Sequence, residues 1–216
     1  MNDKLVVFFD FDNTITRFDV IDDMLERFSM DDRWIALENK WKKGRIGSRE
    51  CLKGQVEGIR ISRKGLDSYL HRVKLDPHFK KILGLLRSKN VKTVILSDNF
   101  DYILKTVLKV NGVNGLRIYS NKVKVANDRL MPSFPLAKKN CNGTCGHCKD
   151  TSMHRVAGKG DTLVYIGDGR SDICPAKSAD IVFAKDALLD YFRSKKLEHI
   201  PIKDLGAVYK YFKTLL

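Results

Sequence analysis

Two carboxylates follow an apolar run near the beginning of the chain. Asp10 and Asp12 come directly after residues 4–9 and are two positions apart. In extended backbone, side chains at i and i+2 point the same way, so the two carboxylates can share one cation and divide acid–base work. One could attack an electrophile while the other handles the proton of the leaving group. An isolated pair of this kind is more often a turn or a helix cap, so the chemistry depends on further residues.

Further polar groups of the same character follow later apolar runs. Ser97 and Asp98 follow residues 91–96, and Ser97 offers a hydroxyl to a phosphoryl oxygen. Asp168 and Asp172 follow a third run beside glycines that let backbone approach a ligand. Carboxylates gathered at one point repel one another unless a divalent cation lies among them. The sequence therefore predicts a Mg²⁺ site, with Lys149 supplying a fixed positive charge.

The elements that must position these residues alternate between strand and helix. Four apolar segments predict buried strands that each end near an acid: 4–9, 91–96, 162–166 and 181–184. Helical patterns separate or follow them: 77–88, 102–110, 171–178, 187–195 and 203–215. This alternation predicts an α/β fold with a doubly wound, Rossmann-like parallel sheet. Ligands bind such sheets at the carboxyl ends of the strands, where the acids fall.

Residues 17–76 have a different pattern. They contain four amphipathic helical segments and no strand candidate: 21–28, 32–42, 48–58 and 64–73. We interpret them as a helical cap domain inserted after the first strand, over a core domain of residues 1–16 and 77–216. Trp34 and Trp41 are seven positions apart, which predicts packing on one helix face. Residues 117–130 predict a hairpin.

Composition limits the function classes. The 216 residues carry a formal net charge of +14, which favours anionic substrates and also allows nonspecific nucleic-acid binding. The lysines are spread over nearly every helix, so a solvated lysine-rich surface is the simpler interpretation. No apolar run is long enough to span a membrane, and the first residues have no secretory signal. We expect a cytoplasmic protein with reduced thiols; the oligomeric state stays open.

The segments 9–14, 97–98 and 167–172, together with Lys149, resemble the four motifs of the haloacid dehalogenase superfamily. The helical insertion resembles the C1 cap of its phosphoserine-phosphatase-like branch, subfamily IB. The resemblance covers nearly the whole chain. It implies a Mg²⁺-dependent phosphatase that forms an aspartyl phosphate on a small phosphorylated metabolite.

The resemblance also implies a role for each motif residue. Asp10 is the implied nucleophile, and Asp12 is the implied acid that protonates the leaving oxygen and then activates water. Asp10, the backbone carbonyl of Asp12, Asp168 and Asp172 are the implied metal ligands, Asp172 through water or as a supporting partner. Ser97 and Lys149 hold the phosphoryl group in this interpretation. Transfer of the phosphoryl group to an acceptor hydroxyl, or processing of nucleic-acid ends, are alternatives.

Substrate preference within the branch depends on the cap. Asp19 falls where phosphoserine phosphatases have a glutamate that contacts the substrate ammonium, whereas Gln55 falls where they have a carboxylate-binding arginine. Loss of that guanidinium disfavours phosphoserine. Segments 141–149 and 183–189 resemble phosphatases of 2-hydroxy-3-keto-5-methylthiopentenyl-1-phosphate, and the cysteine cluster also resembles the phosphoethanolamine/phosphocholine phosphatases.

A cysteine cluster precedes Lys149. Cys141, Cys145 and Cys148 supply soft ligands at spacings that a structural zinc ion could use, with His147 beside them. No second pair of cysteines completes the pattern, and adjacent His147 and Cys148 would bind one ion awkwardly. Reduced thiols or a local disulfide are the alternatives.

Overall fold

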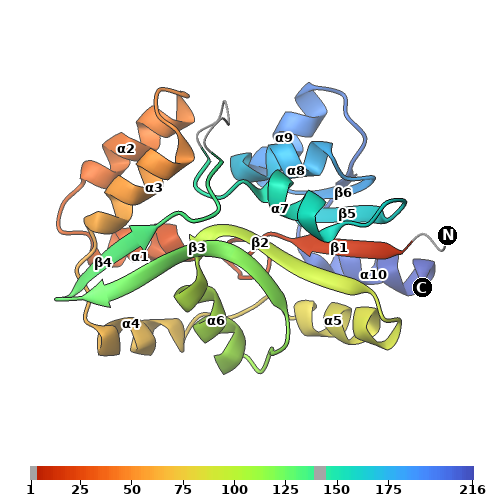
Figure 1. The fold of residues 1–216 in the computed structure, drawn as a ribbon, viewed down its shortest axis with the longest axis horizontal. Helices are drawn as coiled ribbons and strands as arrows, with labels where there is room; N and C mark the ends of the chain where they lie inside the picture. Colours follow the sequence, from red (N-terminus) through yellow and green to blue (C-terminus); the bar gives the residue numbers. More distant parts are fainter. Residues whose placement is uncertain (1–3, 139–144) are drawn as a thin grey trace.

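The computed structural model of the chain describes residues 4–138 and 145–216. Its centre is a seven-stranded sheet with the order β4-β3-β2-β1-β5-β6-β7 (Figure 1). The strands are β1 (Leu5–Phe9), β2 (Lys92–Phe100), β3 (Arg117–Ala126), β4 (Arg129–Ser133), β5 (Thr162–Gly167), β6 (Ile181–Ala184) and β7 (Ile200–Pro201). Neighbouring strands run parallel except β3 and β4, which form an antiparallel hairpin. The predicted doubly wound sheet is confirmed.

Strand β1 is buried on both faces because its apolar residues alternate between two hydrophobic clusters. Val6 and Phe8 pack with one cluster, and Val7 and Phe9 pack with the other. The first cluster lies under α7 (Lys149–Val156), α8 (Ile173–Lys177) and α9 (Asp186–Ser194). The second lies under α5 (Phe79–Ser88), α6 (Asp101–Val110) and α10 (Leu205–Leu215), on the opposite face (Figure 1). All five predicted core helices are present.

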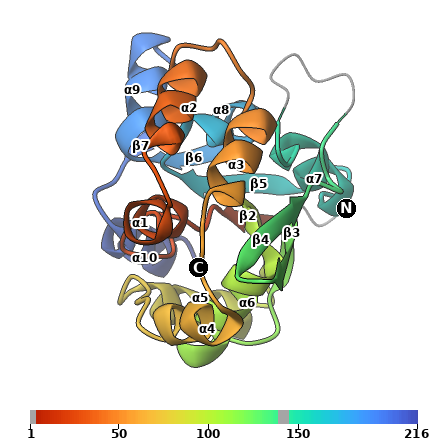
Figure 2. The same ribbon diagram turned by 90° about the vertical axis from the view of Figure 1, so that its left-hand side faces the viewer.

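The insertion after β1 contains the four predicted helices. They are α1 (Val20–Phe28), α2 (Arg33–Lys42), α3 (Ser48–Glu57) and α4 (Arg63–Leu70). Asp19 and Ser62 cap α1 and α4 by accepting hydrogen bonds from backbone N–H groups of the first turn. Helices α2 and α3 stand above the plane of the sheet, whereas α4 lies below it beside α6 (Figures 1 and 2). The assignment of residues 17–76 as a separate domain stays a prediction.

The β3–β4 hairpin reaches the insertion. Asn127 and Asp128 form its turn with positive φ angles of 49° and 55°, as a two-residue turn of type I′ requires. The Asp128 carbonyl accepts a hydrogen bond from Ile61 N at 2.9 Å. Leu130 is buried in the same cluster as the helices of the insertion. The hairpin therefore packs against α3 and the loop that follows it.

Three details differ from the sequence predictions. Strand β2 continues through Phe100, with a register shift between Leu96 and Phe100, so Ser97 and Asp98 lie within it. Helix α2 buries no residue fully. Its Trp34 packs against the core cluster as predicted, whereas Trp41 lines a pocket, so the packing prediction was wrong for Trp41. The two-residue strand β7 was not predicted.

In the described ranges, every helix is too short or too polar to cross a membrane.

Candidate active site

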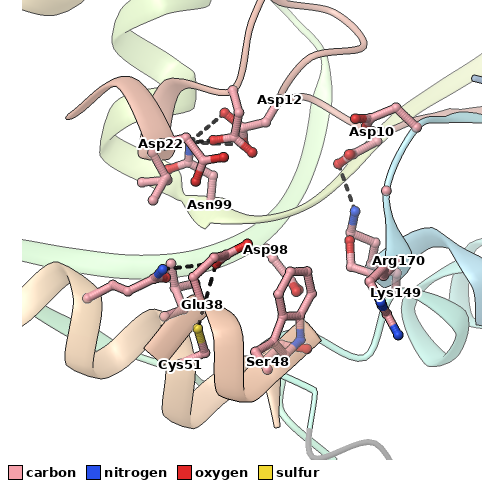
Figure 3. A pocket seen from close by; sticks show the side chains of 18 residues that line it. Asp10, Asp12, Asp22, Glu38, Ser48, Cys51, Asp98, Asn99, Lys149 and Arg170 are labelled. Atoms are coloured by element: carbon pink, nitrogen blue, oxygen red, sulfur yellow. Dashed lines mark hydrogen bonds and ion pairs between the residues drawn. The ribbon is translucent and has the colours of Figure 1, made fainter. Parts of the chain in front are cut away.

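A buried ion-pair cluster lies where the carboxyl ends of β1 and β5 meet. Asp10 follows β1, and Lys149 is the first residue of α7. Lys149 Nζ donates hydrogen bonds to Asp10 Oδ1 and Asp172 Oδ1, both at 2.7 Å (Figure 3 shows the first). All three side chains are at least nine-tenths buried. Residues 139 positions apart in the chain are thus joined in one charged contact, and the contact of Lys149 with a phosphoryl group stays a prediction.

Asp172 is held by hydrogen bonds from several groups around this cluster. It ends the short 3₁₀ helix of residues 170–172 and is fully buried. Tyr165 Oη donates to its Oδ1 at 2.7 Å, and the backbone N–H groups of Asp168 and Gly169 donate to its Oδ2 at 3.1 and 2.9 Å. Because both oxygens already accept hydrogen bonds, the geometry favours Asp172 as a supporting partner of the other acids.

Oxygen atoms suited to a divalent cation gather beside this cluster. One ligand oxygen from each of Asp10, Asp168 and Asp172 lies within 4.8 Å of the others. Burial and the Asp172 charge raise the pKa of Asp10, and the same two causes raise the pKa of Asp168 to about 6. A hard cation that prefers oxygen ligands would relieve this repulsion. The donor set therefore fits Mg²⁺.

Lys149 remains charged in this setting. Burial alone would lower its pKa, but the carboxylates of Asp10, Asp172 and Asp98 raise that pKa above the ordinary value. The Lys149 ammonium therefore stays charged beside Asp10, where it can offset negative charge on a phosphoryl group.

Asp12 is held in a separate set of hydrogen bonds. Asn99 Nδ2 donates to both carboxylate oxygens at 3.0 Å, and Val20 N donates to Oδ1 at 3.0 Å (Figure 3 shows the Asn99 contacts). Burial raises the pKa of Asp12 to about 7, although these hydrogen bonds oppose the shift. A carboxyl that titrates near neutrality can give and take a proton at working pH. Asn99 was missed by the sequence analysis; its spacing of two from Ser97 was the available signal.

Asp168 is fixed by the loop after β1. Asn13 adopts a positive φ of 50°, a conformation that asparagine tolerates, and its Nδ2 donates to Asp168 Oδ2 at 2.8 Å. Thr14 Oγ1 lies 3.2 Å from Asp168 Oδ1. These two residues of the first motif therefore aim the carboxylate of the fourth motif. No role was predicted for Asn13 or Thr14 from the sequence.

The structure separates Ser97 from Asp98. Ser97 is fully buried, its Oγ accepts a hydrogen bond from Asn99 N, and it is absent from the described lining of the pocket. Asp98 lines the pocket, and burial raises its pKa to about 6. A phosphoryl contact of Ser97 stays a prediction.

The insertion supplies the opposite wall of the pocket. Both predicted contacts, Asp19 and Gln55, line it. Gln55 Nε2 donates to Glu38 Oε2 at 3.0 Å, so its amide is already engaged (Figure 3 shows Glu38). The other lining residues of the insertion are Ile21, Asp22, Glu38, Trp41, Ser48, Cys51 and Leu52.

The pocket is acidic although the chain is strongly basic. Its lining contains the carboxylates of Asp10, Asp12, Asp19, Asp22, Glu38, Asp98 and Asp168, and only Lys149 and Arg170 as cations. The net charge of +14 therefore does not extend into the pocket. A polyanionic nucleic-acid backbone would be repelled by these acids.

The predicted zinc site receives no support. Cys141 lies outside the described residues. Both ring nitrogens of His147 lie within hydrogen-bond distance of protein atoms, Ser97 O and Ser152 Oγ. Neither Cys145 nor Cys148 belongs to a group of three close ligand side chains in the described ranges.

Gly167 offers a test of the cluster. A Cβ at this position would lie 2.6 Å from Asp172 Oδ2 and 2.7 Å from its Cγ, and Asp172 cannot move without leaving Lys149. We expect Gly167→Ala to cost about 2–4 kcal/mol of unfolding free energy and to lower kcat at least about tenfold. Denaturant unfolding and initial rates measure the two effects. Gly84→Ala is the control, since no atom lies within 4 Å of its added Cβ; wild-type-like behaviour of Gly167→Ala would contradict the argument.

Comparisons with known proteins identify the family of the chain. A family model described as Putative Phosphatase matches residues 5–196. A 2-hydroxy-3-keto-5-methylthiopentenyl-1-phosphate phosphatase of Brevibacillus brevis is 28% identical over 202 residues, which cover 92% of this chain and 90% of that protein. The protein of the same name from Geobacillus kaustophilus is 28% identical over 204 residues, which cover 93% and 92%.

A solved structure titled as a phospho-aspartyl intermediate analogue of phosphoserine phosphatase aligns with a TM-score of 0.76 at 18% identity. The alignment covers 97% of this chain and 99% of that one. A substrate-bound phosphoserine phosphatase complex aligns with a TM-score of 0.75, also at 18% identity. At this identity the likeness shows the fold. The chain belongs to the putative phosphatase family and has the fold of phosphoserine phosphatase.

Proposed function

We propose that this protein is a Mg²⁺-dependent phosphomonoesterase that transfers the phosphoryl group of a small metabolite to Asp10 and then to water. The buried contact of Lys149 with Asp10 carries the proposal, since it places a permanent cation against a carboxylate at the floor of the pocket. Asp10, Asp168 and the backbone carbonyl of Asp12 would hold Mg²⁺. The ion supplies charge neutralisation for the phosphoryl oxygens.

The residues divide the reaction into two displacements. A carboxylate oxygen of Asp10 attacks phosphorus, the bond from phosphorus to the leaving oxygen breaks, and protonated Asp12 gives that oxygen its proton. Asp12, now ionised, takes a proton from water as the water oxygen attacks phosphorus. The bond from Asp10 to phosphorus then breaks and phosphate leaves. Asn99 and Val20 N hold Asp12 in place through both steps.

The residues of the insertion that line the pocket favour one class of substrate. Asp19, Asp22 and Glu38 present negative charge toward the organic part of the substrate, and Gln55 provides no guanidinium for a carboxylate. Burial and Asp12 raise the pKa of Asp19, and burial and Glu38 raise the pKa of Asp22. A positive charge beside these acids would offset the repulsion. We therefore infer a phosphomonoester without a carboxylate and with a cationic group.

A substrate panel tests this class. Phosphate release with Mg²⁺ is measured for phosphoethanolamine, phosphocholine, phosphoserine, a sugar phosphate, a nucleotide and pyrophosphate. We expect kcat/KM for phosphoethanolamine to exceed that for phosphoserine at least about tenfold. Asp22→Asn combined with Glu38→Gln should reduce this ratio severalfold, whereas Glu50→Gln, an exposed acid on α3 outside the lining, should not.

The outcomes of the panel separate the two parts of the proposal. The panel is extended to 2-hydroxy-3-keto-5-methylthiopentenyl-1-phosphate, whose organic part is uncharged; preference for this compound would overturn the cationic class and retain the phosphatase. Release that favours nucleotides or phosphoserine would also contradict the argument from the acidic wall. Absence of release on every compound, with Mg²⁺ bound, would count against the hydrolase itself.

A further inference from the structure

His147 lies two residues before Lys149 and is almost fully buried, at 2% exposure. It belongs to the cysteine-rich segment that the sequence analysis considered for zinc. The proposed reaction gives it no part, yet it lies at the junction of β2, the segment before α7, and the first turns of α7. Its contacts assign it another task.

The hydrogen bonds of the ring fix its tautomer. Nδ1 lies 3.0 Å from the carbonyl oxygen of Ser97, which can only accept, so Nδ1 carries the proton. Nε2 is then the acceptor for the hydroxyl of Ser152, 2.7 Å away. Burial lowers the pKa of His147 to about 4, which keeps the ring neutral near pH 7. A neutral ring with this tautomer joins the end of β2 to α7.

The backbone of His147 is attached to the same strand. Its N–H donates to Asp98 Oδ1 at 3.0 Å, and Asn121 Nδ2 on β3 donates to the Asp98 carbonyl at 2.6 Å. Two successive residues of β2, Ser97 and Asp98, therefore hold one residue of the segment before α7. His147 also contacts Ser152, and its carbonyl accepts a hydrogen bond from Lys149 N at 3.0 Å, so it makes four hydrogen bonds in all.

The position of Lys149 depends on this attachment. Lys149 carries a long side chain with several rotatable bonds, and its Nζ must reach Asp10 and Asp172 together at 2.7 Å. Catalytic geometry of this kind tolerates errors of only fractions of an ångström. Resting on the proposed phosphatase function, we propose that His147 is a positioning residue, which docks the start of α7 on β2 and thereby sets Lys149 against Asp10.

Replacement of His147 tests the proposal. We expect His147→Ala to lower kcat about 10- to 100-fold, at temperatures well below its unfolding transition. His147→Asn should recover most of this loss, because its amide N–H can replace Nδ1–H toward Ser97. His154→Ala is the matched control: His154 is an exposed histidine on α7, and we expect its removal to leave kcat unchanged.

A double-mutant cycle separates positioning from general support of the fold. Lys149→Met alone should lower kcat about 10²- to 10³-fold. If His147 acts through Lys149, then His147→Ala in the Lys149→Met background adds less than about a twofold loss. The same full loss in both backgrounds, or wild-type kcat in folded His147→Ala, would overturn the proposal.

A structural readout is independent of activity. In a crystal structure of His147→Ala, Lys149 Nζ should lie beyond hydrogen-bond distance of Asp10, whereas His154→Ala should retain the contact. An unchanged Lys149–Asp10 contact in His147→Ala would refute positioning even if the wild type released no phosphate from any substrate. If the wild type released no phosphate from any substrate, the proposed phosphatase function would be refuted instead. Failure of the positioning role and failure of the phosphatase function are therefore distinguishable.

Discussion

Asp10→Asn is expected to abolish turnover, lowering kcat at least about 10⁴-fold while leaving the fold intact. The amide has the shape of the carboxylate but cannot form an acyl phosphate with phosphorus. Asp10 is 6% exposed and Lys149 Nζ lies 2.7 Å from its Oδ1, so no other carboxylate takes its place without rebuilding the cluster. Initial rates on the best substrate of the panel, with circular dichroism as the check of folding, measure the effect.

The covalent step has its own readout. Acid quenching of the wild type during turnover should leave a fraction of the protein heavier by one phosphoryl group, and Asp10→Asn should show none. Asp190→Asn, an exposed acid on α9, is the matched control and should behave like wild type in both measurements. Near-normal turnover by Asp10→Asn would show that another residue is the nucleophile.

Removal of divalent metal is expected to silence the enzyme and to lower its stability in a pH-dependent way. Mg²⁺ added to EDTA-treated protein at pH 7.5, at about 100 times its dissociation constant, should restore activity. It should also raise Tm by about 5–10 °C. At pH 5 the Tm increase should fall below about half of that, because protons and Mg²⁺ compete for the same oxygens.

The direction in which the stability of the metal-free protein changes with pH follows from the raised pKa values. Burial raises the pKa of Asp12 to about 7 and the pKa values of Asp98 and Asp168 to about 6, against ordinary values near 3.9. Between about pH 4 and pH 7 the metal-free native state therefore binds more protons than the unfolded state, and its unfolding free energy falls as pH rises. His147, with its pKa lowered to about 4, acts in the opposite direction but is a single group.

Thermal unfolding from pH 5 to pH 8, with EDTA or with Mg²⁺, measures this linkage. Asp168→Asn removes one of the raised carboxyls and a predicted ligand, so it should weaken the Mg²⁺ response in both activity and Tm. Activity that is indifferent to chelation, or a Tm increase as large at pH 5 as at pH 7.5, would contradict the metal assignment.

The sheet could be predicted because β1, β2, β5 and β6 carry continuous apolar runs that only a strand buried on both faces accommodates. The helices of the insertion were predicted from their amphipathic spacing. The end of β2 was not, because polar Ser97, Asp98 and Asn99 interrupt the apolar pattern while their backbone still extends the strand beside β3. The packing of Trp41 was missed because the same period describes a buried face and a pocket wall.

The acids of the site were predicted from their places after the strands. The ion pair of Lys149 with Asp10 was not predicted, because Lys149 begins helix α7 and was expected only as a positive charge for the phosphoryl group. The contacts of Asn99, Asn13 and His147 could not be read from sequence, since each joins segments far apart in the chain through a single side chain. The acidity of the pocket could not be predicted either, because the net charge of the chain sums a basic exterior and a small acidic pocket.

The turn of the β3–β4 hairpin limits how this enzyme can be recombined with its relatives. Asp128 binds the backbone of Ile61, and Leu130 is buried in the cluster shared with the insertion, although both follow the insertion by more than fifty residues. A chimera that exchanged residues 17–76 alone would bring a foreign surface to a hairpin shaped for the original one. The unit that evolution or a protein engineer can transplant is therefore discontinuous, and substrate preference should diverge in step with residues 127–130.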